Sequence, residues 1–92
     1  MTTYTSLLSH SPQYGVEDWI VTIRENHSYD LPYLSELREM VRRDAAQPYY
    51  RARVVGSFRY LLGDFQQSQH FLDRTDRELI NRVISIFRQE LS

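Results

Sequence analysis

The C-terminal segment places the tightest constraint on how this chain can fold. Between residues 76 and 91 the apolar side chains recur at helical spacing and cover an arc of roughly 160° on a helical wheel. The set consists of Leu79, Ile80, Val83, Ile84, Ile86, Phe87 and Leu91. One neighbouring helix cannot cover so wide an arc, so this helix must pack between two elements of its own domain or against a second copy of the chain. For a homodimer, the predicted dimer face is Leu79, Ile80, Val83 and Ile86.

Two further signals predict where the helices of the second half begin and end. Thr75 and Glu78 have the T-x-x-E spacing of a capping box, which marks the start of the last helix. Upstream, a helix over about residues 49–62 is predicted, with Gly63 as its C-cap residue. Residues 64–73 are then a connector with at most one helical turn. The core stripe of the helix over 49–62 is expected to comprise Tyr50, Val54, Phe58, Leu61 and, from the following turn or after a helical distortion, Phe65.

Apolar side chains at helical spacing also predict two helices in the first half. Val16, Trp19 and Ile23 lie on one helical face, although the β-branched run WIVTI leaves a strand open as the alternative. Trp19 is expected to anchor the core. A second helix follows the polar break at residues 26–30, with Asp30 as its N-cap, and Pro48 ends it or opens the next element.

The length of 92 residues suits one compact domain that buries roughly 60 to 65 % of the surface of its unfolded chain. Residues 1–15, rich in serine and threonine, are predicted to form a flexible arm. Residues 16–92 are predicted to form a single all-α domain, a small bundle of three to four helices.

Composition narrows the functional classes. The net charge of −1 excludes a basic field over the whole molecule, so nucleic-acid binding would need a local patch. The absence of cysteine removes disulfides and thiolate chemistry and favours an intracellular protein. No secretory leader or membrane-spanning stretch is recognisable, so a cytoplasmic location is expected.

Signatures of catalysis or metal binding are missing from the sequence. His10, His27 and His70 lie far apart and form no H-x-x-x-H pair. The spacing of His27 with Asp30 and of His70 with Asp73 is explained as well by aspartates that cap helices. No glycine-rich phosphate loop occurs. We therefore expect a protein without enzymatic activity, metal or cofactor.

The helix over 49–62 has a second face that is only partly polar. Opposite its core stripe, small residues at positions 52, 56 and 63 form a notch bordered by two tyrosines and two arginines. Glycine inside a helix costs roughly 1 kcal/mol relative to alanine, so a close approach to the backbone is expected at position 56. Either another helix of the same domain or a partner protein fills the notch. The predicted partner-binding residues are Tyr49, Ala52, Arg53, Gly56, Arg59 and Tyr60.

These observations favour a small module that binds another protein, as an adaptor, assembly factor, inhibitor or regulatory subunit. The expected surfaces are the helix over 49–62 and the wide apolar face of the helix over 76–91. Tyrosine and arginine are frequent anchors of protein interfaces. All eleven basic residues are arginines, which leaves a nucleic-acid-associated regulator as the alternative. That alternative would use Arg42, Arg43, Arg51, Arg53 and Arg59.

Overall fold

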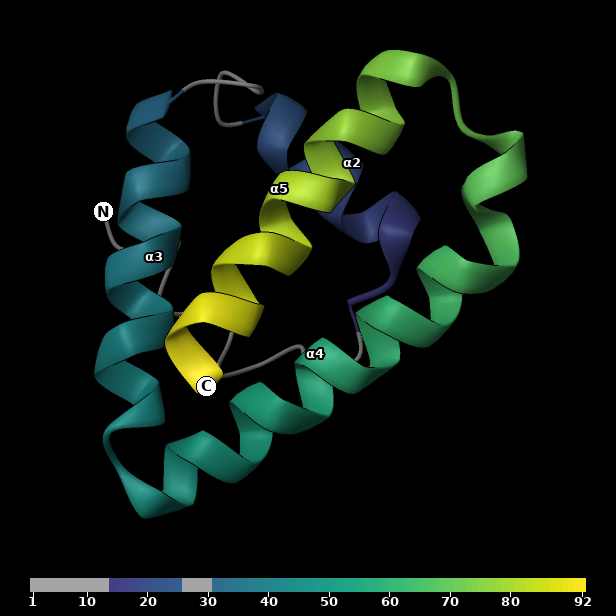
Figure 1. Cartoon of the computed structure of the whole chain (residues 1–92). Helices are drawn as coiled ribbons and strands as arrows, with labels where there is room; N and C mark the ends of the chain where they lie inside the picture. Colours follow the sequence, from purple (N-terminus) through teal and green to yellow (C-terminus); the bar gives the residue numbers. More distant parts are fainter. Residues whose placement is uncertain (1–13, 26–30) are drawn as a thin grey trace.

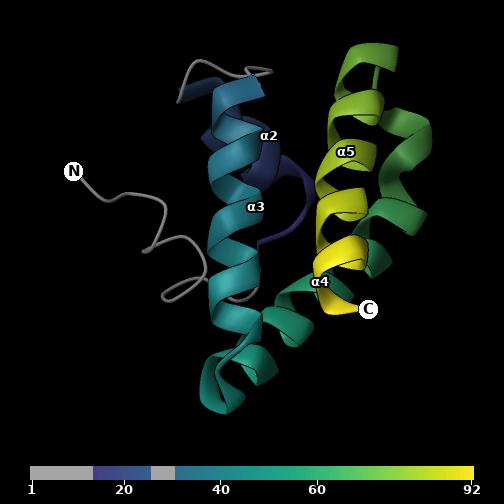
Figure 2. The ribbon, with the colours of Figure 1, turned by 60° about the vertical axis from the view of Figure 1, so that its left-hand side comes forward.

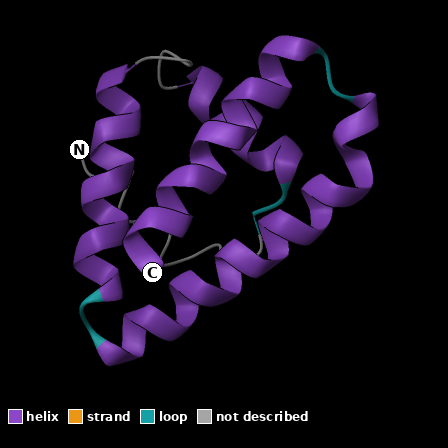
Figure 3. Ribbon diagram, viewed as in Figure 1, coloured by secondary structure: helices purple, strands orange, loops and turns teal. Residues whose placement is uncertain are grey.

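The protein is a bundle of α-helices. The computed structural model describes residues 14–25 and 31–92, and Figure 1 shows their arrangement. Within these ranges the elements are α2 (Val16–Glu25), α3 (Leu31–Ala45), α4 (Pro48–Ser68), the 3-10 helix η1 (Gln69–Phe71) and α5 (Arg74–Leu91). The described residues contain no strand (Figure 3). The predicted all-α class is therefore confirmed, and residues 16–25 form a helix rather than a strand. Most of the predicted arm, and the predicted cap Asp30, lie outside the described residues.

Helix α5 lies at the centre of the bundle and contacts α2, α3 and α4. Helices α3 and α4 meet at the short turn formed by Ala46 and Gln47, and Pro48 opens α4 rather than ending α3. From that turn α4 runs along the outer edge of the bundle to the corner at η1, where the chain turns back into α5 (Figures 1 and 2). One side of α4 therefore faces the bundle and the other faces away from it.

The wide apolar face of α5 is covered by helices of the same chain. Leu79 and Ile86 are 3 % and 4 % exposed, and Ile80 and Val83 are fully buried. The structure thus takes the first of the two alternatives, in which α5 packs between elements of its own domain. The predicted dimer face is part of the core and is not a free surface for a second copy.

Trp19 anchors the core, as predicted. Its side chain is 1 % exposed. Its ring lies edge-on between Tyr14 and Phe87, with centroid distances of 5.7 and 5.9 Å. Phe58 of α4 stacks on Phe87, with the two ring centroids 5.7 Å apart. This aromatic chain joins the start of α2 to α5 and α4 and buries a large apolar area.

The predicted end of α4 is wrong. The helix continues through Gly63 to Ser68, and Gln69 is its C-cap residue. Continuation keeps Phe65 in register one turn beyond Leu61, where its side chain is only 7 % exposed. Burying a phenylalanine stabilises by about 1.5 to 3 kcal/mol, which outweighs the cost of about 1 kcal/mol for glycine in a helix interior. The connector predicted over residues 64–73 is therefore limited to residues 69–73, which include η1.

The predicted capping box of α5 is also wrong. Helix α5 begins at Arg74, and Asp73 is its N-cap residue, with a carboxylate that accepts a hydrogen bond of 2.8 Å from the backbone N–H of Asp76. Thr75 therefore lies inside the helix. The capping role that the sequence offered for Asp73 is confirmed. Asp76 is held in turn by Arg24 of α2, whose guanidinium donates to both carboxylate oxygens at 2.9 and 3.0 Å.

Candidate interaction surface

The inner face of α4 joins this helix to the core. Val54, Ser57, Leu61 and Phe65 are its buried residues. Tyr50, which the sequence placed in the core, is instead 36 % exposed in the first turn and packs edge-on against Tyr49 at 5.2 Å. Ser57 was missed, because its polar side chain does not fit an apolar pattern. Its hydroxyl is fully buried without a hydrogen-bond partner.

The outer face of α4 is open at its centre. Gly56 is exposed, and a Cβ atom built at this position meets no atom within 4 Å. Ala52, one turn earlier, is also exposed, and the same open space surrounds a Cβ at Gly63. None of the helices α2 to α5 therefore fills the notch that the sequence predicted. The small residues lie on a surface that the described residues leave uncovered.

Tyr49 and Arg53 border this notch at the start of α4. The Tyr49 side chain is 69 % exposed, and the Arg53 guanidinium carbon lies 5.8 Å from the centre of its ring. This cation–π contact holds the arginine against the tyrosine without occupying the guanidinium N–H groups. Gln47, the N-cap residue of α4, makes no side-chain capping hydrogen bond. Tyr49 and Arg53 are therefore both available to a binding partner.

Arg59 and Tyr60 border the notch further along the helix. Arg59 is exposed, and the Tyr60 residue is 49 % exposed. The Tyr60 ring leans toward the start of α2, since a Cβ built at Gly15 would lie 3.4 Å from its Cε2 atom. The six predicted partner-binding residues thus share one side of α4, and none of them is fully buried. These six residues are the outer face of α4.

The position of α4 is fixed by a contact that sequence reasoning missed. The carboxylate of Asp64 accepts a hydrogen bond of 2.7 Å from the backbone N–H of Val16, in the first turn of α2. A Cβ at Gly15 would lie 2.5 Å from the same carboxylate oxygen, so only glycine permits this approach. The two ends of the contact are far apart in sequence. Only Gly15 directly before a helix start could have hinted at it.

Three of the five arginines predicted for a nucleic-acid surface are engaged within the protein. Arg42 pairs with Glu90 at 3.0 Å, and Arg43 pairs with Asp44 at 3.2 Å. Arg51 donates to the carbonyl oxygens of Ala45 and Leu91, both at 3.1 Å. The five side chains therefore do not form one continuous basic surface.

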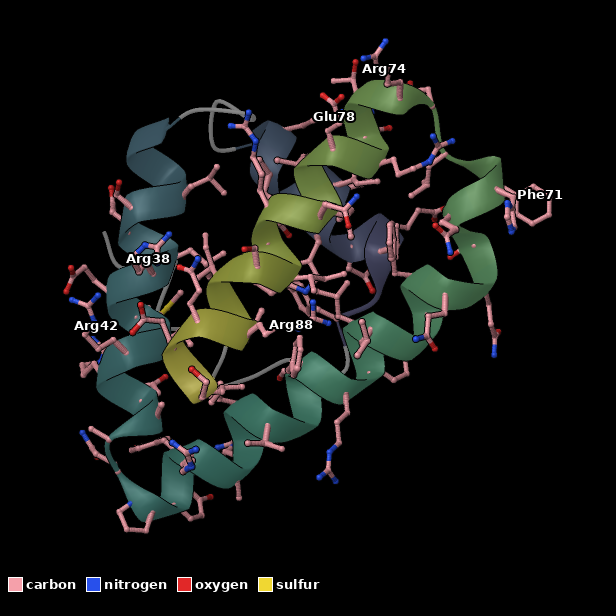
Figure 4. The ribbon with its side chains drawn as sticks, in the orientation of Figure 1. Arg38, Arg42, Phe71, Arg74, Glu78 and Arg88 are labelled. Atoms are coloured by element: carbon pink, nitrogen blue, oxygen red, sulfur yellow. The ribbon has the colours of Figure 1, made fainter. Side chains whose placement is uncertain are left out.

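Glu90 joins the end of α5 to two arginines of α3. It accepts hydrogen bonds from Arg42 and, at 3.4 Å, from Arg38; both arginines are labelled in Figure 4. The hydrogen bond and charge of Arg42 lower the pKa of the Glu90 carboxyl below its usual value, and the same contact raises the pKa of Arg42. This cluster links two helices of the bundle, and its charged groups are paired with one another.

Two hollows lie elsewhere on the surface. A groove of about 270 Å³ lies between α3 and α5 and is lined by Leu34, Ser35, Arg38, Arg82, Ser85 and Ile86. A hollow of about 350 Å³ lies beside Phe71, which is 86 % exposed and points away from the corner between α4 and α5 (Figure 4). Neither gathers a nucleophile with a base and an orienting acid.

Metal ligands do not cluster in the described part of the chain. No group of three or more His, Asp or Glu side chains there is arranged to hold a metal ion. His70 is exposed, and the predicted pair His27 and Asp30, like His10, lies outside the described residues. Among the helices that the structure describes, none has the length and apolar character needed to cross a membrane.

Comparisons with protein families, with curated proteins and with solved structures gave no match for this chain. The surface of the molecule is therefore the basis for inferring its function.

Proposed function

We propose that this protein is a non-enzymatic interaction module that binds another protein through the outer face of α4. Its role would be that of an adaptor, assembly factor, inhibitor or regulatory subunit. The observation that carries this proposal is the open space at Gly56 in the middle of a long helix. A glycine there costs about 1 kcal/mol of helix stability, and no contact within the described fold makes use of its missing side chain. A partner that approaches the backbone closely would make use of it.

The residues around Gly56 support the same proposal. Tyrosine and arginine are enriched among the residues that carry binding energy in protein interfaces. Here two of each border the small residues Ala52 and Gly56, on the side of α4 that faces away from the bundle. The wide apolar face of α5 is not part of the proposed surface, because it is buried in the core. A cytoplasmic location without a cofactor accompanies this proposal, and it rests on the lack of cysteine and of cofactor motifs in the sequence.

Co-purification tests the proposed function. The tagged protein is isolated from its native cells with and without nuclease treatment, and the bound proteins are identified by mass spectrometry. A discrete protein that remains bound after nuclease treatment supports the proposal. Loss of all bound proteins on nuclease treatment would contradict it and favour the arginine-based alternative, in which binding to phosphates also weakens steeply with salt.

A further inference from the structure

The charge along the part of α4 that precedes Asp64 is one-sided. From Ala45 to Gly63 the chain contains no aspartate or glutamate, whereas three arginines lie within the same stretch. All twelve acidic residues of the protein lie outside it. The outer face of α4 is therefore positive, although the whole molecule carries a net charge of −1.

Two of these three arginines make no hydrogen bond or ion pair with the described residues: Arg53, which is half-buried against Tyr49, and Arg59, which is exposed. Arg51 is turned toward the carbonyl oxygens of Ala45 and Leu91. Arg53 and Arg59 take part in none of the ion pairs found among the described residues. Exposed guanidinium groups without a carboxylate partner can form charge-assisted, bidentate hydrogen bonds with an incoming carboxylate.

The two arginines flank the notch on opposite sides. At 100° per residue each of them lies about 60° from Gly56 around the helix, one on either side. Along the helix axis they are about 9 Å apart, given a rise of about 1.5 Å per residue. A partner helix seated on Ala52 and Gly56 would therefore have one arginine at each of its edges.

We propose that the partner segment bound by this face is an acidic helix. Its small or flat apolar side would pack on Ala52 and Gly56, and carboxylates along its two edges would pair with Arg53 and Arg59. Tyr49 and Tyr60 would exclude water at the two ends of the contact. This inference rests on the proposed function and adds the chemistry of the partner. A nucleic acid fits the face less well, because two accessible arginines do not make the basic stripe that tracks a phosphate backbone.

Site-specific photo-cross-linking tests this inference. Benzoylphenylalanine replaces Tyr60, an aromatic residue that borders the notch and is 49 % exposed, so that Ala52 and Gly56 stay small. The control carries the probe at Asn81, an exposed residue of α5. After irradiation in native cells, the cross-linked peptide is mapped by mass spectrometry. The expected product is a protein segment in which acidic residues outnumber basic ones. A neutral or basic segment would overturn the inference and leave the proposed function intact. No protein product at position 60 above the Asn81 control, or a nucleic-acid product, would overturn both.

Charge reversal provides the second measurement. Arg53→Glu together with Arg59→Glu is expected to lower the cross-link yield at position 60 at least about tenfold, because carboxylates would then face carboxylates. Arg74→Glu is the matched control, since its side chain is 88 % exposed at the far end of the molecule. Changing the mapped carboxylates of the partner to arginine should restore the yield with the doubly reversed variant. An unchanged yield after reversal contradicts the acidic partner. Arg59→Glu alone, which disturbs no contact with Tyr49, checks the result if the double variant folds poorly.

Discussion

The two faces of α4 differ in what the fold requires of them. On the inner face, Leu61 is fully buried and Val54 is 1 % exposed, and both pack in the core beneath α5. On the outer face, the space around Gly56 is empty within 4 Å of a built Cβ. The inner face thus accounts for the stability of the helix in the bundle. The composition of the outer face, with its glycine, tyrosines and arginines, needs another explanation.

Two glycines show the same difference between a packed position and an open one. Gly15 is buried against the Asp64 carboxylate, where a side chain would collide with a contact that caps α2. A Cβ built at Gly56 meets no described atom within 4 Å. The first glycine therefore serves a contact within the fold. The second serves no contact among the described residues.

Leu61→Ala is expected to have the largest effect on the free energy of unfolding. Removing a fully buried leucine leaves a cavity in the core, and such changes cost about 2 to 5 kcal/mol. Urea unfolding followed by circular dichroism measures the loss. Tyr49→Ala on the outer face is the control, with an expected change within about 0.5 kcal/mol. Equal losses for the two variants would show that both faces of α4 are structural.

Gly15→Ala is expected to cost about 1 to 3 kcal/mol, because the new methyl group would lie on the Asp64 carboxylate and force it to move. Asp64→Ala removes the cap of α2 at a cost of about 1 kcal/mol. In the double variant the methyl group no longer meets the carboxylate, so the two losses should not add. Additive losses in a double-mutant cycle of unfolding free energies would argue against this contact.

Gly56→Ala is expected to stabilise the protein by about 1 kcal/mol, since the helix gains alanine propensity and the methyl group meets nothing. Gly63→Ala is the matched control on the same helix and should stabilise by a similar amount. Partner capture is expected to weaken for Gly56→Ala, because its methyl group would lie where the partner approaches the backbone, and Gly63→Ala is a control for stability alone. A loss of stability at position 56 would mean that this face is covered within the protein.

Glu90→Gln is expected to have the smallest effect on stability. The effect should be present at neutral pH and absent in strong acid. Arg42 lowers the pKa of Glu90 in the folded protein, so this contact stabilises above the usual carboxyl pKa and is lost as the pH falls through the lowered value. The variant should therefore be slightly less stable than wild type at neutral pH and equal to it in strong acid. Thermal unfolding midpoints across this range measure the difference. A deficit that persists in strong acid would assign it to packing rather than charge.

Helical periodicity was enough to predict the fold class and most of the core. Trp19 and the stripe of α5 could be recognised because regular spacing directly reflects burial on one side of a helix. The end of α4 could not, because the local preference of Gly63 is weaker than the burial of Phe65 four residues after Leu61. Helix ends depend on such competing contributions, which a helical wheel does not contain.

The candidate surface was predictable in composition but not in exposure. A wheel places Ala52, Gly56 and Arg59 opposite the core stripe, yet it cannot tell whether another helix covers them. That answer depends on how α2, α3 and α5 pack against α4 in three dimensions. The Asp64 contact was out of reach, because its partner at Val16 is separated by 48 residues.

Retention of the protein partner by Gly56→Leu is the most direct test of the proposed surface. Wild type and variant are isolated side by side from nuclease-treated extracts, and the bound partner is quantified by mass spectrometry alongside each thermal midpoint. We expect the variant to fold at least as stably as wild type, since the space at Gly56 is open. We also expect it to lose most of its partner, because a leucine would fill the notch. Equal retention by the two proteins would contradict the account and leave the outer face of α4 as ordinary solvated surface.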